Sequence, residues 1–211
     1  FSLVVVLIAI VTIGALTLIG KQTKTALNNV AGGLSGGAHP PVLYAATQGS
    51  RLIPIDVQAG TVGASLASNA QSIVLSPDGR TLYVTDGAAN ALLVIDTASG
   101  QAAPHIALGK SPEGVSASPD GRTIAVAVEE SNSVTLVDPI TRERLADIPV
   151  EGKNPEHAVF SPDGRWLLVS AEEAEQVDII DVAARRQVGR VAVGLRPRGI
   201  GFSPDGRIAY V

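Results

Sequence analysis

The chain has 211 residues, of which 45% are hydrophobic, and a formal net charge of −4; this length allows one sizeable core or two small domains. Residues 1–41 hold two lysines and no acidic residue, so the remainder carries −6. An acidic body without clustered Lys and Arg argues against nucleic acid as the main partner. The absence of Cys excludes disulfides and thiolate metal sites.

An uncharged apolar segment, FSLVVVLIAIVTIGALTLIG, occupies residues 1–20. As a helix it would span ~30 Å, about the thickness of the hydrocarbon core of a bilayer. Apolar residues continue at helical spacing among polar ones as far as Ala31, and two glycines follow, which is typical of a helix end. The sequence therefore predicts one long hydrophobic α-helix over residues 1–31 and a Gly/Ser/Pro linker over residues 32–41.

The apolar segment has three interpretations. A cleavable signal peptide would need a basic start and a small-x-small cleavage site, and the segment has neither. A plain membrane anchor fits its length. The stretch LIAIVTIGALTLIGKQTKTALNNVAGGL resembles the short pilins of tight-adherence (Flp-type) pili. In that family the subunits are small, secreted and nearly all helix, and their apolar halves pack together into the core of a filament. The resemblance implies helix packing through the following residues: Leu7, Gly14, Leu16 and Gly20.

The rest of the chain contains an internal repeat. The letters SPDGR begin at Ser76, Ser118, Ser161 and Ser203, at steps of 42, 43 and 42 residues. Each unit splits into four runs of strand length separated by turn residues; in the second unit the runs are 82–86, 92–97, 102–108 and 114–118. Ser-Pro-Asp-Gly fits a type I turn with a left-handed glycine, as in a tight hairpin. Four antiparallel strands in 40–45 residues are typical of a propeller blade.

These repeats resemble the YVTN family of β-propellers, through YVTD at residues 83–86 together with VIDT and SPDGR. The resemblance covers residues 43–211 and implies a β-propeller of four-stranded antiparallel blades over residues 42–211. With the long N-terminal helix predicted above, the expected fold class is mainly β with one preceding α-helix. Members of the YVTN family usually close into a ring of seven blades, which needs ~290 residues at this period. The four units are therefore expected to be part of a larger ring, and a four-bladed ring closed by its terminal strands is the alternative.

The best candidate binding site is the rim made by the loops that enter the first strand of each blade. Its residues are Gln71, Lys110, Glu113, Lys153, Glu156, His157, Arg196 and Arg198. The acidic residues of other loops are placed on the opposite face and interpreted as solvated; these are Glu129, Glu130, Glu172, Glu173 and Glu175. No catalytic triad, metal-ligand spacing or dinucleotide fingerprint is present. The sequence therefore predicts no catalytic residue, no metal and no cofactor, and hence that the chain is not an enzyme.

Taken together, these features predict a pilin-like structural subunit of an extracellular filament that displays its propeller for binding or adhesion. Its partners would be further copies of itself, through the helix, the membrane before assembly, and a surface ligand; no nucleic acid is expected. The alternative is a membrane-anchored propeller that binds its ligand outside the cytoplasm. A propeller enzyme of the lactonase or quinoprotein kind is the third possibility, although fold alone does not establish activity.

Overall fold

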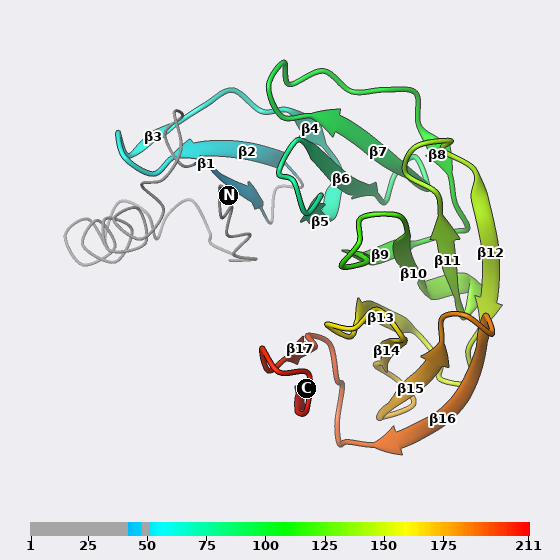
Figure 1. The fold of residues 1–211 in the computed structure, drawn as a ribbon. Coiled ribbons are helices and arrows are strands. Elements are labelled where there is room, and N and C mark those ends of the chain that lie inside the picture. The colour runs from blue at the N-terminus through cyan, green and yellow to red at the C-terminus, as the bar shows by residue number, and fades with distance from the viewer. Residues whose placement is uncertain (1–41, 48–50) are drawn as a thin grey trace.

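The computed structural model describes residues 42–47 and 51–211, and these form strands arranged in successive blades (Figure 1). Blade 1 comprises β1 (Val42–Ala46), β2 (Arg51–Asp56), β3 (Thr61–Val62) and β4 (Ala67–Ser68). Blade 2 comprises β5 (Ala70–Leu75), β6 (Thr81–Asp86), β7 (Ala91–Asp96) and β8 (Ile106–Ala107). Blade 3 comprises β9 (Pro112–Ala117), β10 (Ile124–Val128), β11 (Ser133–Val137) and β12 (Arg144–Pro149). Blade 4 comprises β13 (Pro155–Phe160), β14 (Trp166–Ala171), β15 (Gln176–Asp181) and β16 (Arg186–Ala192).

Strand order is simple in blades 2, 3 and 4, because each strand pairs antiparallel with the next one along the chain. In blade 1, β3 and β4 both pair with β2. A final hairpin of β17 (Gly201–Phe202) and β18 (Ala209–Tyr210) follows blade 4. The prediction of four-stranded antiparallel propeller blades is therefore confirmed. The strand expected at 114–118 forms β9, the first strand of blade 3, so the sequence unit runs across two blades.

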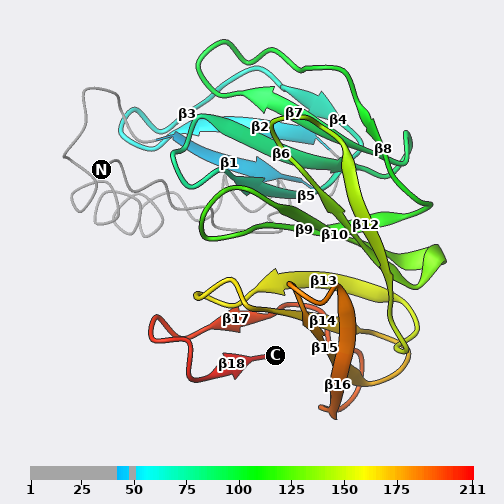
Figure 2. The same ribbon diagram turned by 45° about the vertical axis from the view of Figure 1, so that its right-hand side comes forward.

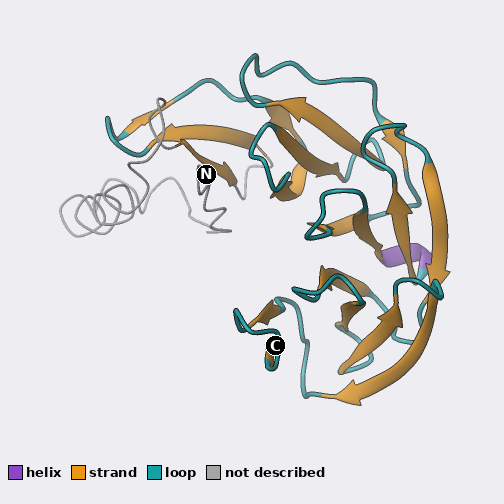
Figure 3. Ribbon diagram, in the orientation of Figure 1, coloured by secondary structure: helices purple, strands orange, loops and turns teal. Residues whose placement is uncertain are grey.

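The structure corrects one part of the predicted fold class. The described residues form strands and one 3-10 helix, η1 (Glu129–Ser131), and contain no α-helix (Figure 3). Their apolar runs are short and separated by turn residues, which favours strands. The predicted hydrophobic α-helix over residues 1–31 is no part of the described fold, and its packing residues Leu7, Gly14, Leu16 and Gly20 lie outside the described residues.

No helix in the described part of the chain is long and apolar enough to span a membrane.

The blades follow one another along an arc, with β5, β9 and β13 on its inner side and β12 and β16 on its outer side (Figures 1 and 2). Within the described residues β18 pairs with β17 and not with β1, so the alternative of a four-bladed closed ring is not formed.

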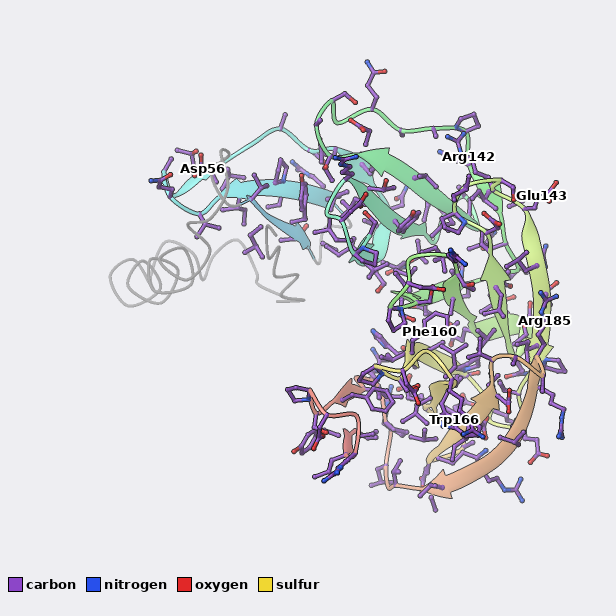
Figure 4. The ribbon with its side chains drawn as sticks, viewed as in Figure 1. Asp56, Arg142, Glu143, Phe160, Trp166 and Arg185 are labelled. Atoms are coloured by element: carbon purple, nitrogen blue, oxygen red, sulfur yellow. The ribbon has the colours of Figure 1, made fainter. Side chains whose placement is uncertain are left out.

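The core consists of three apolar layers, each between two consecutive blades. Between blades 3 and 4, for example, Leu136 packs with Phe160 and Leu167, and Phe160 lies between those blades in Figure 4. At the outer edge Arg185 reaches back from blade 4 and donates to the Leu145 carbonyl of blade 3 at 2.9 Å (Figure 4). Each blade is thus held in place by its neighbours.

The SPDGR turn joins the first and second strands of a blade and has the same bonds each time. In blade 2, Gly79 N donates to the Ser76 carbonyl at 2.8 Å, and Gly79 has a φ of +72°. The Ser76 hydroxyl donates to Asp78 Oδ1 at 2.6 Å and accepts from Thr81 N at 3.0 Å. The turns that begin at Ser118, Ser161 and Ser203 repeat these bonds. The predicted tight hairpin is confirmed.

Candidate functional site

The loops opposite the SPDGR turns form the mouth of the arc. The first strand of each blade begins at this end, and the second strand, which runs antiparallel to it, ends there. Residues at the start of β9 and β13 therefore meet residues that follow β10 and β14. Together with the segment before β17 they enclose a pocket of about 520 Å³, which we call the mouth pocket. It is lined by Glu113, Glu129, Asn154, Glu156, Glu172, Glu173, Arg196 and Arg198.

Four of the eight rim residues predicted from the sequence line the mouth pocket: Glu113, Glu156, Arg196 and Arg198. The other four do not. Lys110 is exposed and lies 3.9 Å from Glu130, and Lys153 and Gln71 are also exposed. His157 follows Glu156 in β13 and is half-buried; the carbons of its ring lie 2.7 Å from where a Cβ on Gly114 would stand. Its Nδ1 is buried and has no hydrogen-bond partner among the described residues.

The placement of the acidic loops on the opposite face is wrong. Glu129, Glu172 and Glu173 line the mouth pocket, because the loop after a second strand returns to the end at which the first strand began. Ser111, which precedes β9, shows this directly: its hydroxyl donates to Glu129 Oε2 at 2.8 Å, and its carbonyl accepts from Glu129 N at 2.9 Å. The antiparallel order of the predicted strands was the signal that could have placed these residues.

Glu172 lies at the centre of a charged network that includes both arginines. Its side chain is 8% exposed. Arg196 binds its Oε1 through both Nε and Nη2. Arg198 Nη2 donates to its Oε2 at 2.9 Å and lies 3.6 Å from Oε1 of Glu156. One guanidinium therefore joins two buried carboxyl groups, of which Glu156 lies in β13 and Glu172 in the loop after β14.

The two carboxyl groups are driven to opposite protonation states. Burial, and then the hydrogen bond shared with Glu172, raise the pKa of Glu156 to about 8. The same hydrogen bond, and then those from Arg196 and Arg198, lower the pKa of Glu172 to about 2. Two buried carboxylates this close repel each other, so one holds the proton while the arginines stabilise the charge on the other. At neutral pH a neutral acid thus lies beside a carboxylate.

Glu113 adds a third carboxyl group to the pocket from β9. Burial, and then the charge of Glu129, raise its pKa, while the Ser111 hydroxyl, 3.4 Å from Glu113 Oε1, acts against this. Burial, and then the charge of Arg198, lower the pKa of His157.

Within the described ranges no group of three or more His, Cys, Asp or Glu side chains is arranged to hold a metal ion. The mouth pocket is therefore suited to proton transfer between carboxyl groups, with two guanidinium groups beside them.

Two family models match adjacent parts of the chain. The model described as "Lactonase, 7-bladed beta-propeller" matches residues 44–143. The model described as "Cytochrome D1 heme domain" matches residues 125–211. No curated protein matches this chain.

Solved structures give the same fold. Hydrazine synthase from Kuenenia stuttgartiensis is 25% identical with a TM-score of 0.70, over 76% of this chain and 49% of its own length. A functionally unknown protein from Desulfotomaculum acetoxidans is 17% identical with a TM-score of 0.69, over 80% of this chain and 57% of its own length. The chain therefore spans about half the length of each of these structures. It has a β-propeller domain similar to those of the lactonase and cytochrome D1 families.

These comparisons overturn two predictions about function. The matched families and the solved synthase are propellers, and their names include a lactonase and a synthase. The interpretation as a pilin-like filament subunit is therefore wrong, and so is the prediction that the chain is not an enzyme. Both rested on residues 1–34 and on the lack of a local catalytic motif, whereas the carboxyl pair of the mouth pocket is assembled from separate strands.

Proposed function

We propose that this chain supplies the catalytic mouth of a propeller enzyme that hydrolyses a cyclic ester. The observation that carries the proposal is the buried pair of Glu156 and Glu172, whose pKa values of about 8 and about 2 lie on opposite sides of the ordinary glutamate value. A carboxyl group held neutral at pH 7 beside a carboxylate is suited to the role of general acid. The match to the lactonase model over residues 44–143 supports an ester as the substrate.

The pocket residues divide the work of hydrolysis. Glu113 acts as the general base, since its raised pKa makes it a stronger base than Glu172. It takes a proton from water while the water oxygen bonds to the lactone carbonyl carbon, and the carbonyl electron pair moves onto the oxygen. Arg196 and Arg198 stabilise that oxyanion with the guanidinium N–H groups not used by Glu172; their side chains are 75% and 59% exposed.

Glu156 completes the reaction as the general acid. As the carbonyl re-forms, the bond to the ring oxygen breaks, and the Glu156 proton passes to that oxygen to give the free alcohol. The proton on Glu113 then returns to Glu156 through solvent. One water is added and a hydroxy acid is released. Glu172 keeps Glu156 protonated and holds both arginines in place.

The match to a haem domain raises a second possibility, which the mouth pocket does not support. Haem iron is held by His, Cys, Met or Tyr ligands, and no residue that lines the pocket is of these types. His157 is the nearest candidate in sequence, but its ring packs on Gly114. The lining is made of charged side chains and one amide, whereas a flat apolar ring system needs apolar walls. These residues do not fit haem.

The proposal is tested by hydrolysis of a panel of γ- and δ-lactones with the purified chain, measured as proton release in a pH-stat. The wild type is expected to hydrolyse at least one of them. Glu156→Gln removes the proton donor and is expected to lower kcat roughly 100-fold or more. Glu143→Gln is the matched control, because Glu143 is exposed at the outer edge of blade 3 (Figure 4). Wild-type activity in Glu156→Gln, or no hydrolysis of any lactone, would overturn the proposal.

A further inference from the structure

Two buried hydroxyl groups occupy the same repeat position in different blades. Thr85 in β6 and Ser170 in β14 each lie nine residues after the Ser that opens the SPDGR turn. Both are 0% exposed. A buried hydroxyl needs hydrogen-bond partners. Each side chain finds one partner in its own blade and one in the repeat that follows.

In blade 2 the hydroxyl links two inner strands. Ser72 N, in β5, donates to Thr85 Oγ1 at 2.9 Å. Thr85 Oγ1 in turn donates to the backbone carbonyl of Glu113, in β9 of blade 3, at 2.8 Å. A hydroxyl has one hydrogen, and the Glu113 carbonyl is its nearer acceptor, since the Ser72 carbonyl lies at 3.4 Å. Thr85 therefore connects blade 2 to the backbone of a mouth residue.

Blade 4 repeats the arrangement towards the next hairpin. His157 N donates to Ser170 Oγ at 3.1 Å, and Ser170 Oγ donates to the backbone carbonyl of Arg198 at 2.6 Å. Arg198 lies three residues before β17 begins, and among the described residues no strand pairs with it. Glu113 is also weakly paired, since the β9–β10 register shifts beside it. Both mouth residues thus lie where the ladder gives the backbone little support.

Blade 3 differs at this position, and the difference shows what the hydroxyl does. The equivalent residue is Ala127. The backbone of Glu156, the mouth residue of the next blade, instead approaches Gly114 directly: a Cβ on Gly114 would lie 2.6 Å from the Glu156 carbonyl oxygen. Each mouth residue of blades 3 and 4 and of the following hairpin is therefore located by the preceding blade, either through a hydroxyl or by close packing on glycine.

We infer that Thr85 and Ser170 are positioning residues for the mouth pocket: each holds the backbone of a mouth residue so that the Glu113 carboxylate and the Arg198 guanidinium point at the substrate. This inference rests on the proposed function for its catalytic consequence but not for its structural one. Arg198 depends more on its hydroxyl than Glu113 does, because Glu113 lies within a strand and Arg198 does not.

The test compares Ser170→Ala and Ser170→Thr with Ser116→Ala. Thr85 shows that this position accepts threonine, so Ser170→Thr keeps the donor. Ser116 Oγ donates across the same kind of blade interface at 2.6 Å, but to the Ala158 carbonyl, two residues beyond Glu156. It is therefore a matched control for the loss of an inter-blade hydrogen bond that holds no mouth residue. Thermal unfolding of all three variants checks that each is folded.

Two readouts separate the positioning role from the proposed function. In ¹⁵N-arginine-labelled protein, the Arg198 Nε–Hε signal is assigned with Arg198→Lys. We expect it to shift and broaden in Ser170→Ala, and to keep its wild-type position in Ser170→Thr and in Ser116→Ala. For lactone hydrolysis, a misplaced group costs up to about 100-fold, so we expect kcat to fall roughly 10-fold in Ser170→Ala and to recover in Ser170→Thr.

The outcomes are distinct. A shifted Arg198 signal in Ser170→Ala supports the positioning role whether or not the protein hydrolyses a lactone. If the signal shifts but neither the wild type nor any variant is active, the proposed function fails and the positioning role stands. An unchanged Arg198 signal in Ser170→Ala overturns the positioning role, whatever the activity. An equal shift in Ser116→Ala also overturns it, because the effect would then belong to blade packing in general.

Discussion

At one end of blades 2, 3 and 4 and of the final hairpin, the SPDGR turn joins the first two strands. At the other end the same two strands open onto the mouth. The turn end repeats the same residues and the same hydrogen bonds in these three blades and in the hairpin. At the mouth end one repeat position holds Gln71, Glu113, Glu156 and Arg198 in turn. The residues that repeat at the turn end stabilise the backbone of each hairpin. The residues that vary from blade to blade at the mouth end can form one asymmetric site.

The carboxyl groups of the two ends also differ in the direction of their pKa shifts. At the turn end hydrogen bonds, first from the turn serine, lower the pKa of Asp78, Asp120, Asp163 and Asp205. At the mouth, burial raises the pKa of Glu156 and of Glu113. The turn carboxylates thus stabilise the fold as anions, while Glu156 is favoured as a neutral acid, and raised carboxyl pKa values of this kind are concentrated at functional sites.

The largest expected effect concerns pH and stability. The pKa of Glu156 rises from an ordinary 4.5 to about 8, so its stabilising contribution is complete below pH 4.5 and is lost as the pH rises through about 8. At about 1.4 kcal/mol per pKa unit, this loss is on the order of a few kcal/mol. Glu156→Gln is expected to remove this loss, as measured by urea unfolding across the pH range.

The turn end supplies the control of opposite sign. Asp163 has a lowered pKa, so its contribution is present above its ordinary value and is lost as the pH falls. Asp163→Asn is therefore expected to change the acid side of the stability profile and to leave the neutral to alkaline side as in the wild type. If both variants altered the same side, the contrast between the two ends would be wrong.

The second prediction compares two glycines. In Gly114→Ala the new Cβ would lie 2.6 Å from the Glu156 carbonyl oxygen, and overpacking of this kind costs about 2–3 kcal/mol. Gly199→Ala, at the equivalent position two repeats further along the chain, meets no described atom within 4 Å and is expected to cost less than about 0.5 kcal/mol. Chemical denaturation measures both. Equal losses would show that the mouth backbone is not closely packed on Gly114.

The third prediction concerns the turn. Ser118→Ala removes the bonds to Asp120 Oδ1 at 2.6 Å and from Thr123 N at 2.9 Å and leaves a half-buried amide with one partner fewer. The expected loss is about 1–2 kcal/mol. Ser161→Ala should cost a similar amount, because its turn has the same bonds. The rate of lactone hydrolysis by either variant should fall only in proportion to the fraction of protein that is unfolded. A large loss of kcat in the folded variant would show that the turn end takes part in function.

The smallest effect is expected at the rim beyond the pocket. Lys110 and Glu130 form an exposed ion pair at 3.9 Å, and such pairs contribute about 0–1 kcal/mol. Lys110→Ala is therefore expected to change the free energy of unfolding by less than about 0.5 kcal/mol. The same variant should leave the pH profile of hydrolysis unchanged, which a pH-stat series would check. A shifted profile would extend the functional site beyond the residues that line the pocket.

Much of the blade architecture was predictable from the sequence, because it is local. The spacing of the SPDGR letters gave the period, and the bonds of Ser76, Asp78 and Gly79 lie within one turn. The repeat position after Pro112 and Pro155 also led to Glu113 and Glu156 in the mouth pocket. These inferences needed no knowledge of neighbouring blades.

The rest of the site was not predictable in this way. Glu172 belongs to the pocket because β14 returns to the end at which β13 began, and the loops after second strands were assigned to the wrong face. The opposite pKa shifts of Glu156 and Glu172 depend on burial and on Arg198, which approaches from a segment 26 residues further along. Residue spacing within one strand cannot reveal a pair that is assembled from separate segments. The sequence therefore showed no catalytic motif, and the prediction of function was wrong.

The most direct test is an NMR titration of the glutamate side-chain carboxyl carbons, with Glu156 and Glu172 assigned from Glu156→Gln and Glu172→Gln. In the wild type we predict that Glu156 titrates near pH 8 and that Glu172 remains ionised down to about pH 2. That result would establish a neutral acid beside a carboxylate at the mouth of the blades. Titration of both groups near 4.5, the ordinary glutamate value, would contradict the account and leave the mouth pocket as an ordinary charged surface.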